Sequence, residues 1–352
     1  MTLKEIAKEA GVSISTVSRV INKSSTTAAS KEVQDRIWEI VRRTGYTPNS
    51  SARDLKKGRR PDDAPASRSI ACLFARTTDS WSDLFFATLA RSIEEEAFRH
   101  NYVLKYSFTA IDIHNPNTFR LITDNHVDGV AILGRCDHAT LRLLKKYFKS
   151  VVYTGLNLID AQYDQIISDG YEASAAAMNH LIELGHRSIA YIGETENEAR
   201  YAGYRDALAK AGFPFCKERI SNVPLSSEGG YCGMKTLLER HAAFTAVFSS
   251  NDITAIGVMR ALKEAGKRIP DDISVISIDD IVTAQYLSPM LTSVHIPLEE
   301  MGQMAAKILI DRIEGGHRLP VKISLPFYLA RRESCGPAPG THGKKKQAGT
   351  PS

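Results

Sequence analysis

The sequence lacks the motifs by which several large enzyme classes are recognised. Its 352 residues contain no GxxxxGKS or GxxxxGKT phosphate loop, no GxGxxG after a strand, no GxSxG elbow and no HExxH pair. His180 and His186 are six residues apart and would lie on opposite sides of a helix, and we expect His186 in the turn before a strand. The sequence therefore predicts a protein that is not an enzyme and that holds no metal ion or cofactor.

Cysteines and long apolar runs are also scarce. The five cysteines contain no CxxC spacing, and their odd number does not suggest a disulfide framework, so we expect reduced thiols. No run of 18 apolar residues occurs, and the opening MTLKEIAKEA is charged and amphipathic, unlike the apolar region of a signal peptide. These absences predict a cytoplasmic protein with no membrane partner.

Positive charge is concentrated at the start of the chain. Residues 1–60 contain 13 lysines and arginines and six acidic residues, a net charge of +7, whereas the whole chain carries +5. The rest of the chain therefore sums to −2. A local basic block of this kind is expected where a domain contacts the phosphates of a nucleic acid.

The same block contains the pattern of two helices joined by a turn. Apolar residues recur at helical spacing in LKEIAKEA, Gly11 supplies a permissive turn backbone, and Ser13 suits the N-cap of the next helix. That second helix has a polar face of Ser15, Ser18, Arg19 and Asn22 and an opposite face of Val17, Val20 and Ile21. Taken alone, the pattern would favour a capped surface helix on a larger core. The basic charge and a third helix favour a DNA-reading headpiece.

The third helix is predicted from SKEVQDRIWEIVRRTG. Its apolar residues Val33, Ile37, Ile40 and Val41 have helical spacing, and Gly45 can end the helix. Three small helices can share one core, so the sequence predicts an all-α headpiece. The segment that begins at Pro48 is too short to be a stable helix alone and leads into a proline-containing linker.

Beyond the linker, strand-like runs alternate with amphipathic helical stretches. The runs are SIACLFA, YVLKYSF, GVAILG, SVVYTGL, SIAYIG, TAVFSS and ISVISID. This alternation predicts two doubly wound α/β lobes with parallel sheets and a ligand crevice at the carboxyl ends of the strands. The glycine-rich EGGYCGM is interpreted as a turn, because it lacks the basic residue that a phosphate cradle normally adds.

Several segments resemble the lac-repressor/galactose-repressor family of bacterial transcription regulators. They are TLKEIAKEAGVSISTVSRVIN, GYTPNSSARDL, LIELGHRSIAYIG, RYAGYRDAL, SSNDITAIGVMRAL, ISVISIDD and LSPMLTSVHIP, in the family's order from Thr2 to about Ser334. The resemblance implies a helix-turn-helix headpiece followed by a two-lobed α/β domain like that of periplasmic binding proteins. The chain departs from the family in a longer loop, KSSTTAAS, and in Gly155, which stands where the family often has an aspartate.

The resemblance also implies which residues contact DNA. The first turn of the second helix would touch base edges in the major groove, and Arg19 would reach a guanine or a phosphate. Residues 49–58 would form a hinge that becomes helical on DNA, with Leu55 wedged into the minor groove. The alternative is a solvated linker whose Leu55 packs on the headpiece. The predicted DNA-binding residues are Ser13, Ile14, Ser15, Ser18, Arg19, Asn22, Asn49, Ala52 and Leu55.

Polar residues that follow strands form the second predicted site. The predicted effector-binding residues are Asp79, Trp81, Phe85, Arg200, Asn251 and Asp279. The last three match family positions that line the effector pocket, and a guanidinium with a carboxylate suits adjacent sugar hydroxyls. The first three are candidates for an aromatic lip over the sugar ring, with a place in the core as the alternative for the two aromatic rings. Asp252 and Asp280 are left out because each suits a helix N-cap.

The chain divides into four predicted parts. They are a headpiece (1–47), a hinge and linker (48–68), an effector-binding and dimerisation domain (69–334) and a disordered tail (335–352). The tail has no leucine heptads, and the family forms dimers through its α/β body. We therefore expect a homodimer on an inverted-repeat operator.

The predicted function is a DNA-binding repressor of a carbohydrate-use operon, with operator affinity controlled by a small sugar between the lobes. The nearest alternative is a regulator of the same family that answers to a purine or a phosphosugar. A sugar-binding protein without a DNA function is disfavoured by the basic headpiece and the missing signal peptide, and an α/β enzyme by the missing motifs.

Overall fold

The computed structural model describes residues 2–21, 29–44, 68–75, 83–109 and 126–340, together with isolated positions between 115 and 124. The chain divides into two compact units, Met1–Ala66 and Ser67–Ser352. The predicted hinge and most of the loop KSSTTAAS lie outside the described residues. So do six predicted site residues, which are Asn22, Asn49, Ala52, Leu55, Asp79 and Trp81.

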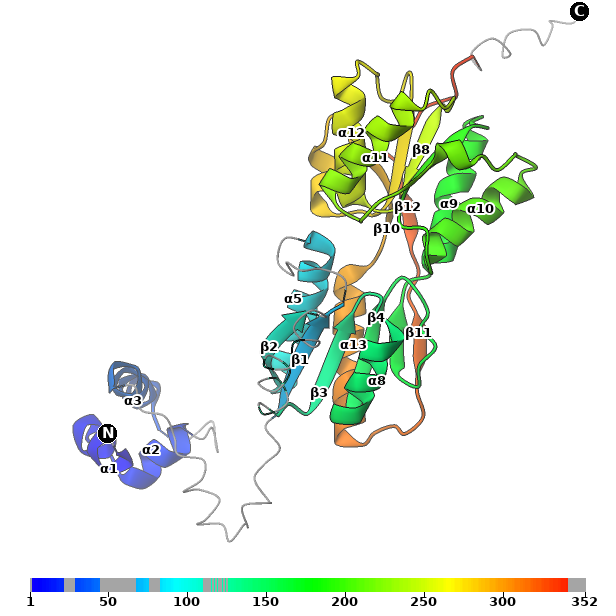
Figure 1. Cartoon of the computed structure of the whole chain (residues 1–352). Coiled ribbons are helices and arrows are strands. Elements are labelled where there is room, and N and C mark those ends of the chain that lie inside the picture. Colours follow the sequence, from blue (N-terminus) through cyan, green and yellow to red (C-terminus); the bar gives the residue numbers. More distant parts are fainter. Residues whose placement is uncertain are drawn as a thin grey trace, which may run out of the picture. The chain divides into compact units, whose positions relative to one another are not determined.

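The described part of the first unit contains three short helices, α1 Leu3–Ala10, α2 Ile14–Ile21 and α3 Lys31–Thr44 (Figure 1). Helix α1 begins with a capping box between Thr2 and Glu5 and ends at Gly11, whose φ of 68° is the left-handed conformation that glycine adopts freely. The apolar faces of the three helices meet in one core of Ile6, Ala7, Ala10, Val17, Val20, Ile37 and Ile40. The predicted helix-turn-helix and third helix are therefore confirmed.

The second unit consists of two α/β lobes. In lobe 1 the strand order is β11-β5-β4-β3-β1-β2, and every neighbouring pair is parallel. The strands are β1 Ser69–Phe74, β2 Val103–Thr109, β3 Gly129–Leu133, β4 Ser150–Gly155, β5 Asp164–Ile167 and β11 Lys322–Ser324. Within the described ranges, the helices of lobe 1 are α5 Leu84–Arg99, α8 His138–Tyr147 and α13 Leu298–Glu314. Helix α13 packs against α5 and against the sheet.

Lobe 2 repeats this order as β12-β10-β9-β8-β6-β7, with every pair parallel except β10 and β12. Its strands are β6 Ile189–Gly193, β7 Ile220–Asn222, β8 Ala246–Ser249, β9 Ser274–Asp279, β10 Thr292–His295 and β12 Tyr328–Ala330. Its helices are α9 Gly170–Glu183, α10 Ala199–Lys210, α11 Ser227–Glu239 and α12 Asp252–Glu264, with 3-10 turns at η2 Lys217–Arg219 and η3 Val282–Tyr286.

The chain passes between the two lobes three times, after β5, after β10 and after β11 (Figure 1). Each lobe is an open sheet of the doubly wound type, in which the crevice outside the carboxyl ends of the strands is the expected ligand site. All seven predicted strands are present, and the predicted fold class is confirmed.

The glycine-rich segment EGGYCGM was wrongly interpreted as a turn, because it forms the first part of α11. The Ser226 hydroxyl caps this helix by accepting a hydrogen bond from Gly229 N at 3.0 Å. Gly230 lies where α11 meets α12, and a Cβ there would lie 2.0 Å from the Thr254 carbonyl oxygen. Glycine is therefore required by a close helix crossing, although its low helix propensity suggested a break.

Lobe 2 extends beyond the predicted domain boundary at Ser334. Gly336 N donates to the Ser274 hydroxyl at 3.1 Å, and Ala338 N donates to the Leu184 carbonyl at 2.9 Å. His186 is buried in the turn before β6, as predicted, and its Nε2 lies 3.0 Å from the Gly336 carbonyl oxygen. The predicted start of the tail at Cys335 is therefore too early, and residues 341–352 lie outside the described residues.

Candidate functional site

A cavity of about 310 Å³ lies between the two lobes. Lobe 1 contributes the start of α5 and the residues that follow β3 and β4, and lobe 2 contributes residues that follow β6, β8 and β9. The cavity therefore occupies the place that the topology predicts for a ligand. Four predicted effector-binding residues line it, which are Phe85, Arg200, Asn251 and Asp279. The structure thus brings together all of the predicted effector-binding residues that it describes.

Phe85 lies in the first turn of α5. The N-cap of this helix is Asp83, whose Oδ1 accepts a hydrogen bond from Phe85 N at 3.0 Å. The Phe85 ring meets the edge of the Phe86 ring with 5.2 Å between centroids, and both rings line the cavity. Phe85 is also part of the buried core, so its aromatic wall is held rigidly.

Arg200 lies in the first turn of α10, where it is buried and forms part of the cavity wall. Its Nε and Nη2 donate to the two carboxylate oxygens of Glu198 at 2.8 and 3.1 Å, and its Nη1 donates to the Ser250 carbonyl at 2.9 Å. Burial alone would lower the pKa of Arg200, but the Glu198 carboxylate raises it above its usual value. Arg200 is therefore a fixed and neutralised cation. The sequence reasoning missed Glu198, for which only its position two residues before Arg200 gave a signal.

Asp279 ends β9 and is buried, with a φ of 123° that side chains other than glycine rarely adopt. Within the described residues its Oδ1 has no hydrogen-bond partner. Burial, followed by the neighbouring Asp252 charge, raises the pKa of Asp279 well above its usual range, and Arg200 only partly offsets this. A buried oxygen without a donor is destabilising unless a bound molecule supplies one. Asp279 thus lines the cavity with a carboxyl group whose hydrogen bonds are incomplete.

The structure reverses the predicted roles of the two residues that begin α12. The N-cap is Asn251, whose Oδ1 accepts from Thr254 N at 3.1 Å, and Asp252 is the first helical residue. Asn251 therefore lines the cavity and also caps α12, whereas the sequence suggested Asp252 as the cap.

Asp252 is fully buried behind the cavity, where its carboxylate joins α12 to β9 and β10. It accepts hydrogen bonds from the Ser277 hydroxyl, from the Ser293 hydroxyl at 2.6 Å and from Ile281 N at 2.8 Å. Burial raises the pKa of Asp252 to about 6, although these hydrogen bonds lower it. No cation pairs with the Asp252 carboxylate among the described residues. Its hydrogen bonds connect buried elements of lobe 2, and it does not cap a helix.

Asp280, the other predicted cap, is not an N-cap either. Its carboxylate pairs with the Arg332 guanidinium at 2.5 Å and with His295 Nδ1 at 3.1 Å. These contacts connect the end of β9 to β10 and to the segment after β12.

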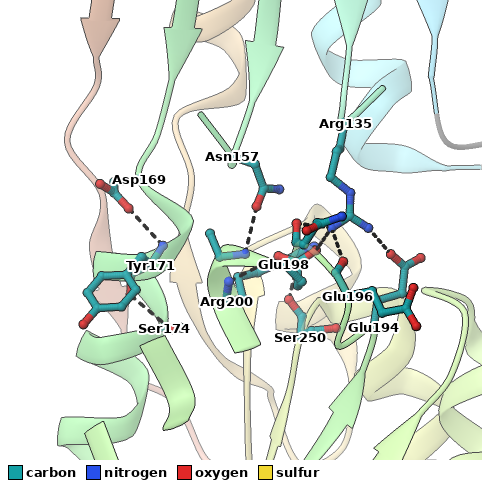
Figure 2. Close-up of polar contacts among 12 residues, drawn as sticks. Arg135, Asn157, Asp169, Tyr171, Ser174, Glu194, Glu196, Glu198, Arg200 and Ser250 are labelled. Atoms are coloured by element: carbon teal, nitrogen blue, oxygen red, sulfur yellow. Dashed lines mark hydrogen bonds and ion pairs between the residues drawn. The ribbon is translucent and has the colours of Figure 1, made fainter. Parts of the chain in front are cut away.

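Two lobe 1 side chains that the sequence reasoning missed also line the cavity, Arg135 after β3 and Asn157 after β4 (Figure 2). Both point toward the loop between β6 and α10 of lobe 2. Gly155, at the position where the family often has an aspartate, ends β4 and also lines the cavity. A Cβ there would lie 2.7 Å from the Tyr153 hydroxyl oxygen. Neither residue belongs to a sequence motif, so only their positions after strands could have indicated them.

In the headpiece, Ser13 is the predicted cap of α2, because its hydroxyl accepts from Thr16 N at 3.1 Å. Ser13, Ile14, Ser15 and Arg19 are exposed, whereas Val17 and Val20 are buried. Arg19 Nε donates to the Ser15 carbonyl at 3.3 Å, which lays its side chain along the exposed face. The start of α2 therefore presents short polar groups and one isoleucine to solvent.

Comparison with known proteins agrees with this architecture. Residues 2–49 match the model of "Bacterial regulatory proteins, lacI family", and residues 178–335 match "Periplasmic binding protein-like domain". The chain is 32% identical over 336 residues to the HTH-type transcriptional repressor PurR of Glaesserella parasuis, an alignment that covers 93% of this chain and 94% of that protein. The chain belongs to the lacI family of bacterial regulatory proteins.

Two solved structures of transcriptional regulators resemble the chain. A CelR-cellobiose complex has 27% identity and a TM-score of 0.71, covering 95% of this chain and 99% of the other. A regulator from Enterococcus faecium with bound ribose has 31% identity and a TM-score of 0.67, covering 76% of this chain and 99% of the other. This LacI-family member is therefore a DNA-binding transcriptional repressor with an effector-binding domain, and not an enzyme.

No helix in the part of the chain that the structure describes combines the length and the apolar composition that a membrane span needs.

Proposed function

We propose that this LacI-family repressor controls a carbohydrate-use operon and that an uncharged sugar, bound between the lobes, sets its affinity for operator DNA. The observation that carries the proposal is the charge state of the cavity wall. Among the described residues that line the cavity, the basic ones are Arg135 and Arg200. Arg200 is paired with Glu198 at 2.8 Å, and Arg135 with Glu194 at 2.5 Å.

A phosphosugar would have to place a dianion beside arginines that are already paired with carboxylates. The cavity wall also holds Asp83 and Asp279, so its carboxylates exceed its guanidinium groups. Transfer of an anion into such a site is unfavourable because it gains no new cation and meets like charge. Sugar hydroxyls, in contrast, can donate to the unsatisfied Oδ1 of Asp279, while the Phe85 ring covers an apolar sugar face.

The two structural relatives support this ligand class, since one is a complex with cellobiose and the other holds ribose. They do not identify the sugar of this protein, and a purine or a phosphosugar is the competing outcome in the test.

A thermal-shift screen of the full-length protein tests the proposal with cellobiose, ribose, glucose 6-phosphate, ribose 5-phosphate and hypoxanthine. A sugar present at 100 times its dissociation constant should stabilise the protein by about 2.7 kcal/mol. Asp279→Asn should remove that shift, because its amide no longer offers the same acceptor. Stabilisation by a phosphosugar or by hypoxanthine, with no response to either neutral sugar, would overturn the assignment.

We further propose that α2 enters the major groove with Ser13, Ile14, Ser15 and Arg19 toward the bases. Small hydroxyls permit close approach, an isoleucine can contact a thymine methyl group, and an arginine can bind guanine or phosphate. Ser18 and Asn22 complete the proposed face, and Asn49, Ala52 and Leu55 remain the proposed hinge contacts. Selection of operators from random DNA should give a different consensus after Ile14 and Ser15 are exchanged. An unchanged consensus would contradict this placement.

The proposed assembly is a homodimer on an inverted-repeat operator in the cytoplasm. Each lobe exposes a large aromatic side chain, Phe98 at 74% and Tyr286 at 79%. Sedimentation of the wild type should show a dimer, and Tyr286→Lys should shift the population toward monomer. A wild-type monomer at micromolar concentration would refute the assembly.

A further inference from the structure

Arg135 of lobe 1 lines the cavity and also makes several polar contacts with one loop of lobe 2. Its Nη2 donates to Glu194 Oε2 at 2.5 Å, and its Nη1 donates to the carbonyl oxygens of Glu196, at 2.7 Å, and of Asn197 (Figure 2). The carboxylate of Glu198 lies 3.7 Å from the same Nη1. One guanidinium group therefore contacts oxygen atoms of four residues between positions 194 and 198, all in the loop between β6 and α10.

The backbone of this loop is shaped for that contact. Asn197 has a φ of 48°, in the left-handed region that asparagine tolerates better than most residues. Arg135 also approaches the amino end of α10, where the helix dipole disfavours a cation. The glutamates at 194 and 198 offset this repulsion, so a neutral side chain at position 135 would leave their charges without their lobe 1 partner.

Asn157 makes a second contact between the lobes beside the first. Its Oδ1 accepts a hydrogen bond at 2.9 Å from the N–H of Ala199, the first residue of α10 (Figure 2). The first N–H groups of a helix have no partner within the helix. A side chain of lobe 1 thus satisfies a helix end of lobe 2.

The loop held in this way is the one that fixes Arg200. Glu198 accepts from Arg200 through the backbone N–H at 3.2 Å and through Nε at 2.8 Å. Movement of lobe 1 away from lobe 2 would release the Arg135 and Asn157 contacts and therefore loosen the support of Arg200.

We propose that Arg135 and Asn157 form an interlobe clasp that closes the cavity without a bound sugar and positions Arg200 through residues 194–199. Both are positioning residues, because they act on Arg200 through the loop. The inference deepens the proposed function, since the clasp closes the proposed sugar cavity. Its test uses the protein without any sugar, so the clasp and the ligand class can fail independently.

Hydrogen exchange of the full-length protein tests the clasp directly. In Asn157→Ala the Ala199 amide loses its acceptor, and we expect its exchange to be at least about tenfold faster, which corresponds to 1.4 kcal/mol of local opening. In Arg135→Gln exchange should rise over residues 194–200. Amides of β8 and β9 report global stability and should keep wild-type rates. Arg142→Gln, which changes an exposed arginine of α8, is the matched control and should leave the loop unchanged.

Salt and a second variant separate a clasp from a general structural role. Raising NaCl to 1 M should increase loop exchange in the wild type, because the Arg135 and Glu194 side chains are partly exposed, and should have less effect in Arg135→Gln. Glu194→Gln should reproduce part of the Arg135→Gln effect, and the double variant should be no worse than Arg135→Gln alone. Wild-type exchange at residues 194–200 in both Asn157→Ala and Glu194→Gln would overturn the proposal. A rise shared equally by β8 and β9 would overturn it as well.

Discussion

The two lobes have the same order of strands but opposite distributions of polar groups at the cavity. Lobe 2 places Arg200, Asn251 and Asp279 there, each held by contacts within lobe 2 or, for Asp279, within a buried strand end. Lobe 1 offers mainly apolar and glycine surface. Of its polar residues there, Asp83 caps α5, and Arg135 and Asn157 are bonded to lobe 2. The shared topology determines where the cavity lies. The residues that follow the strands differ between the lobes. In lobe 2 they supply Arg200, Asn251 and Asp279 to the cavity, and in lobe 1 they supply the Arg135 and Asn157 contacts with lobe 2.

Two buried carboxylates, Asp164 in lobe 1 and Asp252 in lobe 2, have different kinds of hydrogen-bond partner. In lobe 1, Asp164 pairs with Arg312 at 2.7 Å and with His317 at 3.1 Å. In lobe 2, Asp252 is bonded only to hydroxyl groups and one backbone N–H among the contacts described above. The Arg312 guanidinium therefore stabilises the charge of Asp164, whereas Asp252, unlike Glu198 in the same lobe, is held by neutral donors.

The largest expected effect concerns Arg200. Arg200→Ala would leave the buried Glu198 carboxylate without its main partner, which should destabilise the protein by about 3 to 5 kcal/mol. Asp279→Asn should leave stability nearly unchanged or raise it, because it removes a carboxylate whose pKa burial has raised. Both variants should lose the response of operator binding to the stabilising sugar. Urea unfolding and operator titration measure the two properties.

Arg205→Ala is the matched control for this prediction, since Arg205 is an exposed arginine of the same helix. It should keep both stability and response. Full sugar response in Asp279→Asn would show that lobe 2 does not carry the decisive acceptor.

The sequence predicted the parts of the fold that depend on continuous burial. Six of the seven predicted strands are buried throughout, because a strand covered on both faces of a parallel sheet tolerates few polar residues. The seventh, β2, lies at a sheet edge and is only partly buried. The missed strands have three or four residues, and β7, β11 and β12 lie at sheet edges, where less burial is required. Their sequences, ISN, KIS and YLA, are too short to show a period.

The sequence could identify a cavity residue only where a polar side chain directly follows a recognisable strand. This rule found Arg200, Asn251 and Asp279, but it did not reveal that Arg200 was already paired. Arg135 was missed because its acceptors are backbone carbonyls 61 and 62 positions later in the chain, and carbonyl direction is not encoded by any local pattern. The structural reason for Gly230 likewise lies in the other helix of a crossing, α12.

The next effect is a difference in pH dependence between the two buried carboxylates. The pKa of Asp252 is raised to about 6, so the folded state binds more protons than the unfolded state between about pH 4 and 6. The free energy of unfolding should therefore fall by about 3 kcal/mol as pH rises through this window. Asp252→Asn should reduce this fall in urea unfolding measured from pH 4 to 7. The part that remains belongs to Asp279, whose pKa burial also raises.

Asp164 should have the opposite sign. Burial raises its pKa, but hydrogen bonds from Arg312, Val321 N–H and His317 outweigh burial and hold the pKa below its usual value. Its stabilisation should be present above about pH 4 and lost as pH falls further, and Asp164→Asn should flatten that acid limb. The same pH profile for both asparagine variants would contradict the contrast between the lobes.

A smaller effect is expected at the helix crossings, which both lobes build around glycine. A Cβ at Gly230 would lie 2.0 Å from the Thr254 carbonyl oxygen, and a Cβ at Gly302 in lobe 1 would lie 2.6 Å from the Ser92 Cβ. We expect Gly230→Ala and Gly302→Ala to destabilise by about 1 to 3 kcal/mol, with the larger loss at Gly230. Lys235→Ala, at an exposed position of α11, is the control. If either glycine variant were stabilised, helix propensity would outweigh the crossing at that site.

The smallest effect separates the two roles of Asn251. Serine caps a helix about as well as asparagine, so Asn251→Ser should keep the α12 cap and change stability by only a few tenths of a kcal/mol, whereas Asn251→Ala should lose about 1 kcal/mol. Both variants withdraw the amide from the cavity, and both should therefore need more of the stabilising sugar for the same operator response. Asp137→Ala removes the cap of α8 in lobe 1, away from the cavity wall, and should lower stability alone. An unchanged sugar response in Asn251→Ser would make Asn251 a cap only, and the acceptors and donors of lobe 2 would then reduce to Arg200 and Asp279.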